Sequence, residues 1–252
     1  MTLRITEIFY SLQGETRTAG LPTVFVRLTG CPLRCQYCDT AYAFQGGQSM
    51  SLPDILAQVA QYMPVAPGIR PPWMAEVSKM QEHFFDLPPA SLVEPFAGAL
   101  PCKARYVTVT GGEPLAQKNC LALLTALCDA GYEVSLETSG ALDISAVDPR
   151  VSKVVDIKTP ASDESDKNLY SNIEHITARD HIKFVLCDRE DYLWAKDIML
   201  RYNLPARCEI LFSPSHQQIS ATLLADWILQ DRLPVRLQIQ LHKYLWGNTP
   251  GK

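Results

Sequence analysis

The chain has 252 residues, of which 47% are hydrophobic and 20% charged, and its formal net charge is −4. This ordinary globular composition supplies enough apolar material for one large α/β domain or two small ones. There is no basic excess to favour tight nucleic-acid binding, and no apolar run is long enough to span a membrane. The N-terminus lacks the profile of a signal peptide, so we expect the eight cysteines in a reducing cytoplasm, as ligands or core residues rather than disulfides.

Short apolar and β-branched runs alternate with helical patterns along most of the chain. Helical patterns begin after Ser51, a typical N-cap, end before Gly131, a typical C-cap, and recur over 190–202 and 220–230. This alternation predicts βαβ units and a mostly parallel sheet, open or curled into a barrel. The predicted strands are Thr23–Leu28, Tyr106–Thr110, Glu133–Glu137, Lys153–Ile157, His181–Leu186, Arg207–Phe212 and Val235–Gln240.

One proline-rich segment interrupts the alternation. Eight prolines follow Tyr62, the last of them Pro101, which excludes a long regular element, whereas four aromatic residues in the same stretch argue against simple disorder. We therefore predict a single domain over 1–252 with an insertion over 62–104, which contains one helix near Met74–Phe85. The insertion could cap a site, contact a partner subunit or do neither, and decoration is the interpretation that we favour.

Three cysteines follow the first predicted strand with the spacing C-x3-C-x2-C, at Cys31, Cys35 and Cys38. Thiolates this close in sequence can converge on one metal centre. A structural zinc site would need a fourth ligand, but the next cysteine is Cys102. An iron–sulfur cluster held by three cysteines leaves one iron open to a ligand. Three neighbouring core cysteines are the less favoured alternative.

A second motif lies at the end of the predicted strand over 106–110, where the sequence runs Thr-Val-Thr-Gly-Gly-Glu-Pro from Thr108 to Pro114. The two glycines allow the backbone to approach a ligand closely, and the Glu113 carboxylate can accept hydrogen bonds from an ammonium. The motif is weak evidence alone and strong evidence when it follows the cysteine triplet.

The two motifs together, with Tyr37 before the third cysteine, resemble the radical S-adenosylmethionine superfamily. The resemblance implies a full or partial (β/α) barrel and a 4Fe–4S cluster held by Cys31, Cys35 and Cys38. It implies that the open iron binds the amino and carboxylate groups of S-adenosylmethionine. It further implies cleavage of the sulfonium to a 5′-deoxyadenosyl radical that abstracts a hydrogen atom.

Further motifs resemble the 7-carboxy-7-deazaguanine synthase family. The resemblance implies conversion of 6-carboxy-5,6,7,8-tetrahydropterin to 7-carboxy-7-deazaguanine with loss of ammonia, on the route to queuosine and other 7-deazapurines. It implies a requirement for Mg²⁺, recycling of S-adenosylmethionine, an electron donor such as flavodoxin or ferredoxin, and a homodimer, with neither nucleic acid nor membrane as a partner. The motifs lie at Ser11–Glu15, Phe25–Leu28, Cys38–Thr40, Glu137–Gly140 and His242–Tyr244.

This resemblance assigns a role to each matching residue. Thr40 is the expected Mg²⁺ ligand. The expected contacts with S-adenosylmethionine are Tyr37, Cys38, Asp39, Gly112, Glu113, Asp156, Ile157, Lys158, Ser213, Pro214, Ser215 and His216. The expected contacts with substrate are Leu12, Gln13, Gly14, Glu15, Arg27, Thr110, Glu137 and His242. The insertion and the tail over 246–252 depart from the family pattern.

Several of these residues have structural alternatives. A guanidinium on the apolar strand of Arg27 needs an anion, which is either the substrate carboxylate or an internal ion pair. Gly14 could merely form a turn, Thr40 could cap the loop, and Glu137 could form an ion pair at the sheet end. His242 could be satisfied within the core.

Two other functions remain open at this stage. A glycyl-radical activating enzyme would share the cysteine and glycine motifs but needs a protein-docking surface. A non-catalytic zinc-binding module would be colourless, whereas an iron–sulfur protein is brown. The cysteines outside the triplet have no motif spacing, so we do not expect a second cluster; they are Cys102, Cys120, Cys128, Cys187 and Cys208. Cys120 and Cys128 lie eight positions apart on one predicted helix, and we interpret them as core residues.

Overall fold

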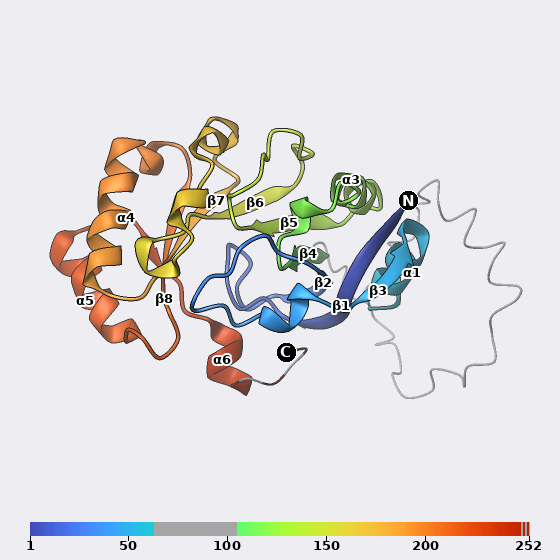
Figure 1. Cartoon of the computed structure of the whole chain (residues 1–252), viewed down its shortest axis with the longest axis horizontal. Helices are drawn as coiled ribbons and strands as arrows, with labels where there is room; N and C mark the ends of the chain where they lie inside the picture. Colours follow the sequence, from blue (N-terminus) through green and yellow to red (C-terminus); the bar gives the residue numbers. More distant parts are fainter. Residues whose placement is uncertain (63–104, 248, 250, 252) are drawn as a thin grey trace, which may run out of the picture.

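The computed structural model describes residues 1–62, 105–247, 249 and 251 (Figure 1). The predicted insertion therefore lies outside the described residues apart from its first residue, Tyr62, and so does the helix predicted near Met74–Phe85.

A nine-stranded sheet forms the centre of the molecule, with the strand order β3-β1-β2-β4-β5-β6-β7-β8-β9. β1 is antiparallel to both of its neighbours, and every pair from β2 to β9 is parallel. The end strands do not pair with each other, so the sheet is open, and the prediction of a partial barrel of mostly parallel strands is confirmed. The strands are β1 (Thr2–Leu12), β2 (Pro22–Leu28), β3 (Gln48–Ser51), β4 (Tyr106–Gly111), β5 (Glu133–Thr138), β6 (Ser152–Asp156), β7 (His181–Leu186), β8 (Glu209–Pro214) and β9 (Arg236–Leu237).

The four longest helices follow β3, β4, β7 and β8 in the chain and cover the outside of the sheet, while the loops after β1 and β2 lie on its inner side (Figure 1). Local capping sets their ends: the Ser51 hydroxyl accepts from the Asp54 amide at 3.3 Å, and Gly131 adopts a φ of +84° after α3. The helices are α1 (Leu52–Tyr62), α3 (Cys120–Asp129), α4 (Arg189–Arg201), α5 (Ala221–Asp231) and α6 (Leu241–Trp246). Short 3₁₀ turns include η1 (Ala41–Phe44), which follows the cysteine loop.

The core forms between the parallel strands and the outer helices. Val26, Val109 and Leu136 on three adjacent strands are fully buried, as are Leu123 on α3 and Tyr192 on α4. Each such apolar side chain contributes roughly 1.5–3 kcal/mol through removal from water. Apolar packing against the outer helices therefore stabilises the sheet. The ends of its strands are free to carry polar groups.

The structure differs from the sequence-based prediction mainly at the two edges of the sheet. β1 and β3 were not predicted, β8 begins two residues later than expected, and β9 is reduced to Arg236–Leu237. β1 alternates buried and exposed residues because one of its faces meets solvent, so it lacks the continuous apolar run of the central strands.

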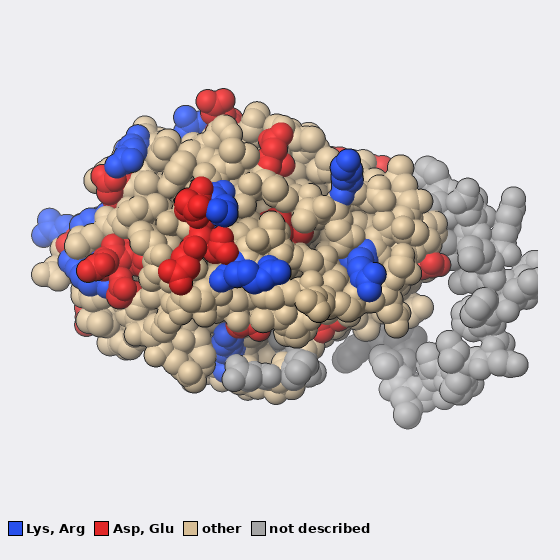
Figure 2. Space-filling view, in the orientation of Figure 1, with Lys and Arg blue, Asp and Glu red and all other residues tan. Residues whose placement is uncertain are grey.

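The surface carries charges of both signs. On the face shown in Figure 2, acidic and basic side chains are interspersed, and neither sign covers a continuous area. Exposed ion pairs such as Arg201–Asp197 add little to stability. Over the described residues, every helix is too short or too polar to cross a bilayer.

Candidate active site

A cavity of about 430 Å³ opens on the inner side of the sheet, where the carboxyl ends of the parallel strands converge. This is the size of a typical ligand site, and in (β/α) barrels this end carries the chemistry. Loops after β1, β2, β4, β5, β6 and β8 line it together with side chains of β7, and the start of α6 closes one side.

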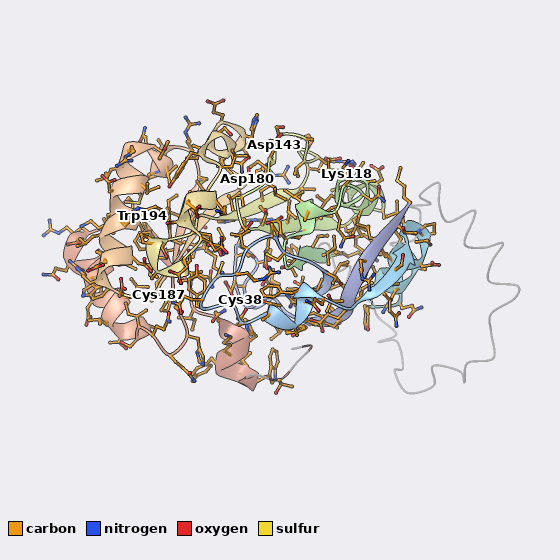
Figure 3. The ribbon with its side chains drawn as sticks, in the orientation of Figure 1. Cys38, Lys118, Asp143, Asp180, Cys187 and Trp194 are labelled. Atoms are coloured by element: carbon orange, nitrogen blue, oxygen red, sulfur yellow. The ribbon has the colours of Figure 1, made fainter. Side chains whose placement is uncertain are left out.

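The cysteine loop after β2 supplies one wall. Cys31, Cys35 and Cys38 all line the cavity, all are partly buried, and all carry free thiols. Figure 3 shows Cys38 on this loop in the middle of the molecule. As positioned, no three His, Cys, Asp or Glu side chains among the described residues surround a common metal position. The loop thus places the three cysteine sulfurs on one wall of the cavity, but they do not surround a common position.

The donor set of this wall fits an iron–sulfur cluster. Burial raises the pKa of Cys35 to about 11, while the nearby Lys158 ammonium acts in the opposite direction. The Cys35 thiol therefore carries a proton that iron would displace on binding. Cys187, at the end of β7, lies beside the same loop and accepts a hydrogen bond from Gln36 at 3.7 Å (Figure 3). It does not line the cavity, so three cysteines face the cavity among the described residues.

The glycines at the end of β4 bring that strand against the cysteine loop. A Cβ on Gly112 would clash with the Gly30 carbonyl and lie 2.8 Å from the Cys31 Cβ. The Glu113 amide donates to the same Gly30 carbonyl at 2.8 Å. Gly112 lines the cavity, and only glycine permits this close approach.

Glu113, an expected contact with S-adenosylmethionine, does not line the cavity. It is fully buried, and its carboxylate accepts hydrogen bonds from the Thr138 hydroxyl at 2.9 Å and the Ser139 amide at 2.7 Å. A carboxylate with these donors is satisfied within the protein. Glu113 therefore holds the end of β5 in place in this structure.

The loop after β1 supplies the opposite wall, and Leu12, Gln13, Gly14 and Glu15 all line the cavity. The Gln13 side-chain amide donates to Thr108 at 3.1 Å and to Glu137 at 3.3 Å.

Glu137 lies at the floor of the cavity beside this wall. Its other carboxylate oxygen accepts from the Thr110 hydroxyl at 3.0 Å. Burial, followed by the neighbouring Glu15 charge, raises the pKa of Glu137. The floor of the cavity thus contains a desolvated carboxyl group within a network of polar donors.

Lys183 lies in the middle of β7 and forms an ion pair with Glu15 inside the cavity. The Gln240 amide donates to the same glutamate at 3.2 Å. The Glu15 charge raises the pKa of Lys183 despite burial, so the ammonium form persists.

The start of α6 connects the two walls. The Leu241 amide donates to the Gly14 carbonyl at 3.1 Å, and the Lys243 ammonium lies 2.8 Å from the Asp39 carboxylate. Lys243 holds the pKa of Asp39 well below its usual range, even though burial opposes this. His242 lines the cavity beside Gly14, and burial lowers the pKa of its imidazole.

Thr40 and Arg27 lie at the same end of the cavity. The Thr40 hydroxyl donates to Asp39 at 2.8 Å, which leaves its oxygen lone pairs available. The Arg27 Nε donates to Glu7 at 2.7 Å, so the internal ion pair considered from the sequence is present. Arg27 also lines the cavity, so an internal ion pair with Glu7 is compatible with a contact to the substrate carboxylate.

The end of β6 provides further polar groups, beside Tyr37 of the cysteine loop. Asp156 and Lys158 form an ion pair of 2.8 Å, and both line the cavity with Tyr37. One Asp156 carboxylate oxygen and the Tyr37 hydroxyl are buried with no hydrogen-bond partner in the described part of the chain. Unsatisfied buried polar atoms are costly, and a polar ligand in the cavity would satisfy them.

Comparison with known proteins agrees with the motifs. No protein-family model matches the chain. A 7-carboxy-7-deazaguanine synthase of Chlorobaculum tepidum is 40% identical over 248 residues, which cover 97% of this chain and 94% of that protein. The chain belongs to the 7-carboxy-7-deazaguanine synthase family.

Other relatives agree. The synthase of Koribacter versatilis is 36% identical over 258 residues, covering 97% of each protein. The crystal structure of QueE from Escherichia coli shares the fold, with a TM-score of 0.67 at 20% identity over 96% of this chain and 95% of that one.

Most residues that the family resemblance singles out therefore meet in one cavity. Ser215 and His216 line it with the residues described above, whereas Ile157, Ser213 and Pro214 do not. Sequence reasoning missed Lys183 and Gln240, and it gave no role to Lys243 within the His242–Tyr244 motif. A lysine within the apolar strand His181–Leu186 was a usable signal of the same kind as Arg27, but the partners of all three residues lie more than 150 positions away.

Proposed function

We propose that the protein is a radical S-adenosylmethionine enzyme that converts 6-carboxy-5,6,7,8-tetrahydropterin to 7-carboxy-7-deazaguanine with release of ammonia. The observation that carries this proposal is the composition of one cavity. Its walls combine the three cysteines of the C-x3-C-x2-C motif with the Leu12–Glu15 loop and Arg27, which match the family's substrate motifs.

Family membership implies two cofactors, a 4Fe–4S cluster and S-adenosylmethionine. When bound, they supply the radical that abstracts a hydrogen atom from the substrate. Cys31, Cys35 and Cys38 would hold the cluster. The unsatisfied Asp156 carboxylate oxygen and the Tyr37 hydroxyl support binding of S-adenosylmethionine beside it.

We assign the opposite wall to the pterin substrate. The Arg27 guanidinium offers a charge-assisted contact to the 6-carboxylate. The Gln13 amide has both donor and acceptor atoms, which suits the edge of a pterin ring. The Glu15 carboxylate, which is paired with Lys183, can accept from the amino group and ring N–H of the pterin. His242 and Glu137 would complete the enclosure.

We also propose a Mg²⁺ ion at Thr40. Mg²⁺ prefers oxygen ligands and retains several waters, so one hydroxyl, the substrate carboxylate and bound waters would complete its coordination. The Asp39 carboxylate beside Thr40 adds negative charge at this position. The ion would thereby connect the substrate carboxylate to the end of the cysteine loop.

The family resemblance supports three further proposals. The cluster needs one electron from outside, which a flavodoxin or ferredoxin would supply. A homodimer is the expected assembly. Thiol-ligated iron and seven free cysteines among the described residues suit a reducing compartment, which supports the cytoplasm as the location.

The test is anaerobic reconstitution with iron and sulfide, followed by incubation with 6-carboxy-5,6,7,8-tetrahydropterin, S-adenosylmethionine, Mg²⁺ and dithionite. We expect a brown protein and formation of 7-carboxy-7-deazaguanine and ammonia, detected by mass spectrometry and an ammonia assay. Cleavage of S-adenosylmethionine without this product would favour an activating enzyme. A colourless protein that retains zinc and no iron would favour a zinc-binding module.

A further inference from the structure

Arg27 is held by a residue that no sequence motif singled out. Glu7 on β1 lies directly opposite Arg27 on β2 in the antiparallel register, just after an irregularity between Ile5 and Glu7. Such a bulge redirects the following side chains. The Glu7 carboxylate then accepts a hydrogen bond from the Arg27 Nε at 2.7 Å.

Tyr42 reaches the same carboxylate oxygen from a different part of the chain. Its hydroxyl donates to Oε1 of Glu7 at 2.8 Å. Tyr42 belongs to η1, which begins directly after Thr40, the proposed Mg²⁺ ligand. Glu7 therefore joins the Arg27 strand to the end of the cysteine loop.

Two aromatic rings also fix the orientation of the guanidinium. The Arg27 Cζ lies 5.8 Å from the ring centroid of Phe9 and 5.9 Å from that of Tyr42. Phe9 is itself stacked on Phe25 with centroids 5.0 Å apart, so it has little freedom to move. Arginine–aromatic contacts of this kind are attractive as well as restrictive.

The hydrogen bond to Glu7 uses the Nε of Arg27, so the two terminal guanidinium nitrogens remain available for a ligand. No described residue forms a hydrogen bond to the terminal nitrogens of Arg27, whereas its Nε is occupied by Glu7. Arg27 lines the cavity, and its side chain is 16% exposed. The two terminal nitrogens of a guanidinium can bind both oxygens of a carboxylate in one plane.

We propose that Glu7 and Tyr42 are positioning residues that orient Arg27 for two-point recognition of the substrate's 6-carboxylate. This inference rests on the proposed function, because it takes the carboxylated pterin as the ligand of Arg27. The bridge also sets the separation between Arg27 and Thr40, the two groups assigned to that carboxylate. Positioning therefore favours ligands that carry a carboxylate at this place over ligands that lack it.

Charge and geometry make opposite predictions for Glu7, which allows a sharp test. If Glu7 only repelled the substrate carboxylate, its removal would strengthen binding of the carboxylated ligand. If it positions Arg27, loss of its acceptor atom weakens that binding. Glu7→Gln removes the charge and keeps an acceptor for Arg27 Nε. Glu7→Met removes both the charge and the acceptor, and its side chain has a similar length.

The experiment is anaerobic calorimetry on the reconstituted enzyme with Mg²⁺ and S-adenosylhomocysteine, which prevents turnover. The dissociation constant is measured for 6-carboxy-5,6,7,8-tetrahydropterin and for tetrahydropterin without the carboxylate. The readout is the preference ratio, which is the dissociation constant of the ligand without the carboxylate divided by that of the carboxylated ligand. We expect Glu7→Met to reduce this ratio about tenfold and Tyr42→Phe at least about threefold, as for lost hydrogen bonds to charged groups. Glu7→Gln should keep the ratio within about threefold of wild type.

Tyr10→Phe is the matched control, because Tyr10 is 45% exposed on the same strand as Glu7 and does not line the cavity. An unchanged or increased ratio in Glu7→Met would overturn the positioning role, and so would equal weakening of both ligands. Unchanged binding of the carboxylated ligand in Arg27→Ala would instead refute the assigned role of Arg27. A wild-type enzyme that forms no product would refute the proposed function, so the three failures are distinguishable.

Discussion

The Glu15 carboxylate and the Lys183 ammonium form an ion pair inside the cavity, although 168 positions separate them in the chain. Glu15 follows β1, and Lys183 lies on β7, five strands further along the sheet. The pair therefore spans the open interior of the partial barrel. Their side chains are only 14% and 15% exposed, so each charge depends on the other for compensation.

Lys183→Met should destabilise the protein and weaken substrate binding, because it leaves the Glu15 carboxylate buried without its partner. Breaking such a pair costs up to about 3–5 kcal/mol in fully buried cases, and Lys183→Arg should recover part of the loss. Thermal unfolding and calorimetry with substrate measure the two effects. Lys196→Met is the matched control, since Lys196 pairs with Asp231 at 2.6 Å outside the cavity. Equal stability losses in both methionine variants, with unchanged substrate affinity, would contradict a role of Lys183 in the cavity.

The central fold could be predicted from the sequence because its signals are local. Strands such as His181–Leu186 are apolar runs that are buried on both faces, and the observed β7 has the predicted bounds. The edges could not be predicted in this way. β3 has four exposed or half-buried residues, and its pairing with β1 is a tertiary contact without an apolar pattern.

Those parts of the candidate site that lie within short sequence motifs could be predicted. The cysteine triplet and the Leu12–Glu15 loop line the cavity as expected. The carboxylate of Glu113 does not, because motif reading cannot tell a ligand contact from the bonds to Thr138 and Ser139. Ion pairs such as Lys243–Asp39 depend on how distant segments meet, which no local pattern records.

Replacement of any cysteine of the triplet by alanine should abolish the cluster. Cys35→Ala removes one of three thiols that face the cavity, and two thiolates cannot retain a three-ligand cluster with full occupancy. Iron and sulfide content and the visible absorption of the reconstituted protein measure the effect. Cys128→Ala, a half-buried cysteine on α3 outside the cavity, should keep the full iron content. A Cys35→Ala protein with a complete, catalytically competent cluster would refute the assignment.

Gly14→Ala should weaken substrate binding while the cluster stays intact. A Cβ at this position would lie 2.5 Å from the His242 Nδ1 and 3.2 Å from its backbone nitrogen, so α6 would have to move away from the loop. Calorimetric affinity for substrate, measured beside iron content, tests this. The double variant with His242→Ala removes the nearest clash and should recover part of any loss in thermal stability. Wild-type affinity in Gly14→Ala would show that the start of α6 does not shape the substrate site.

The stability of the protein should fall as the pH decreases through the range in which histidine titrates. Burial lowers the pKa of His242 against the opposing charges of Glu15 and Asp39, so the folded protein binds this proton less readily than the unfolded chain. The unfolded state then gains protons first as the pH falls through about 6.5, and the free energy of unfolding decreases. Thermal midpoints between pH 8 and 5 should show a smaller decrease for His242→Gln than for wild type. Parallel curves would contradict this contribution.

The activity should depend on Mg²⁺ through the Thr40 hydroxyl. Thr40 ends the cysteine loop, and its hydrogen is donated to Asp39 at 2.8 Å, which turns the oxygen lone pairs toward other partners. Treatment with EDTA should therefore remove activity, and added Mg²⁺ should restore it. Thr40→Val keeps the side-chain volume and loses the oxygen, so the Mg²⁺ concentration for half-maximal activity should rise at least about tenfold. Thr40→Ser restores the hydroxyl and should remain within about threefold of wild type. Equal Mg²⁺ dependence in the valine and serine variants would remove Thr40 from the metal site, and equal rates with and without Mg²⁺ would remove the metal from the reaction.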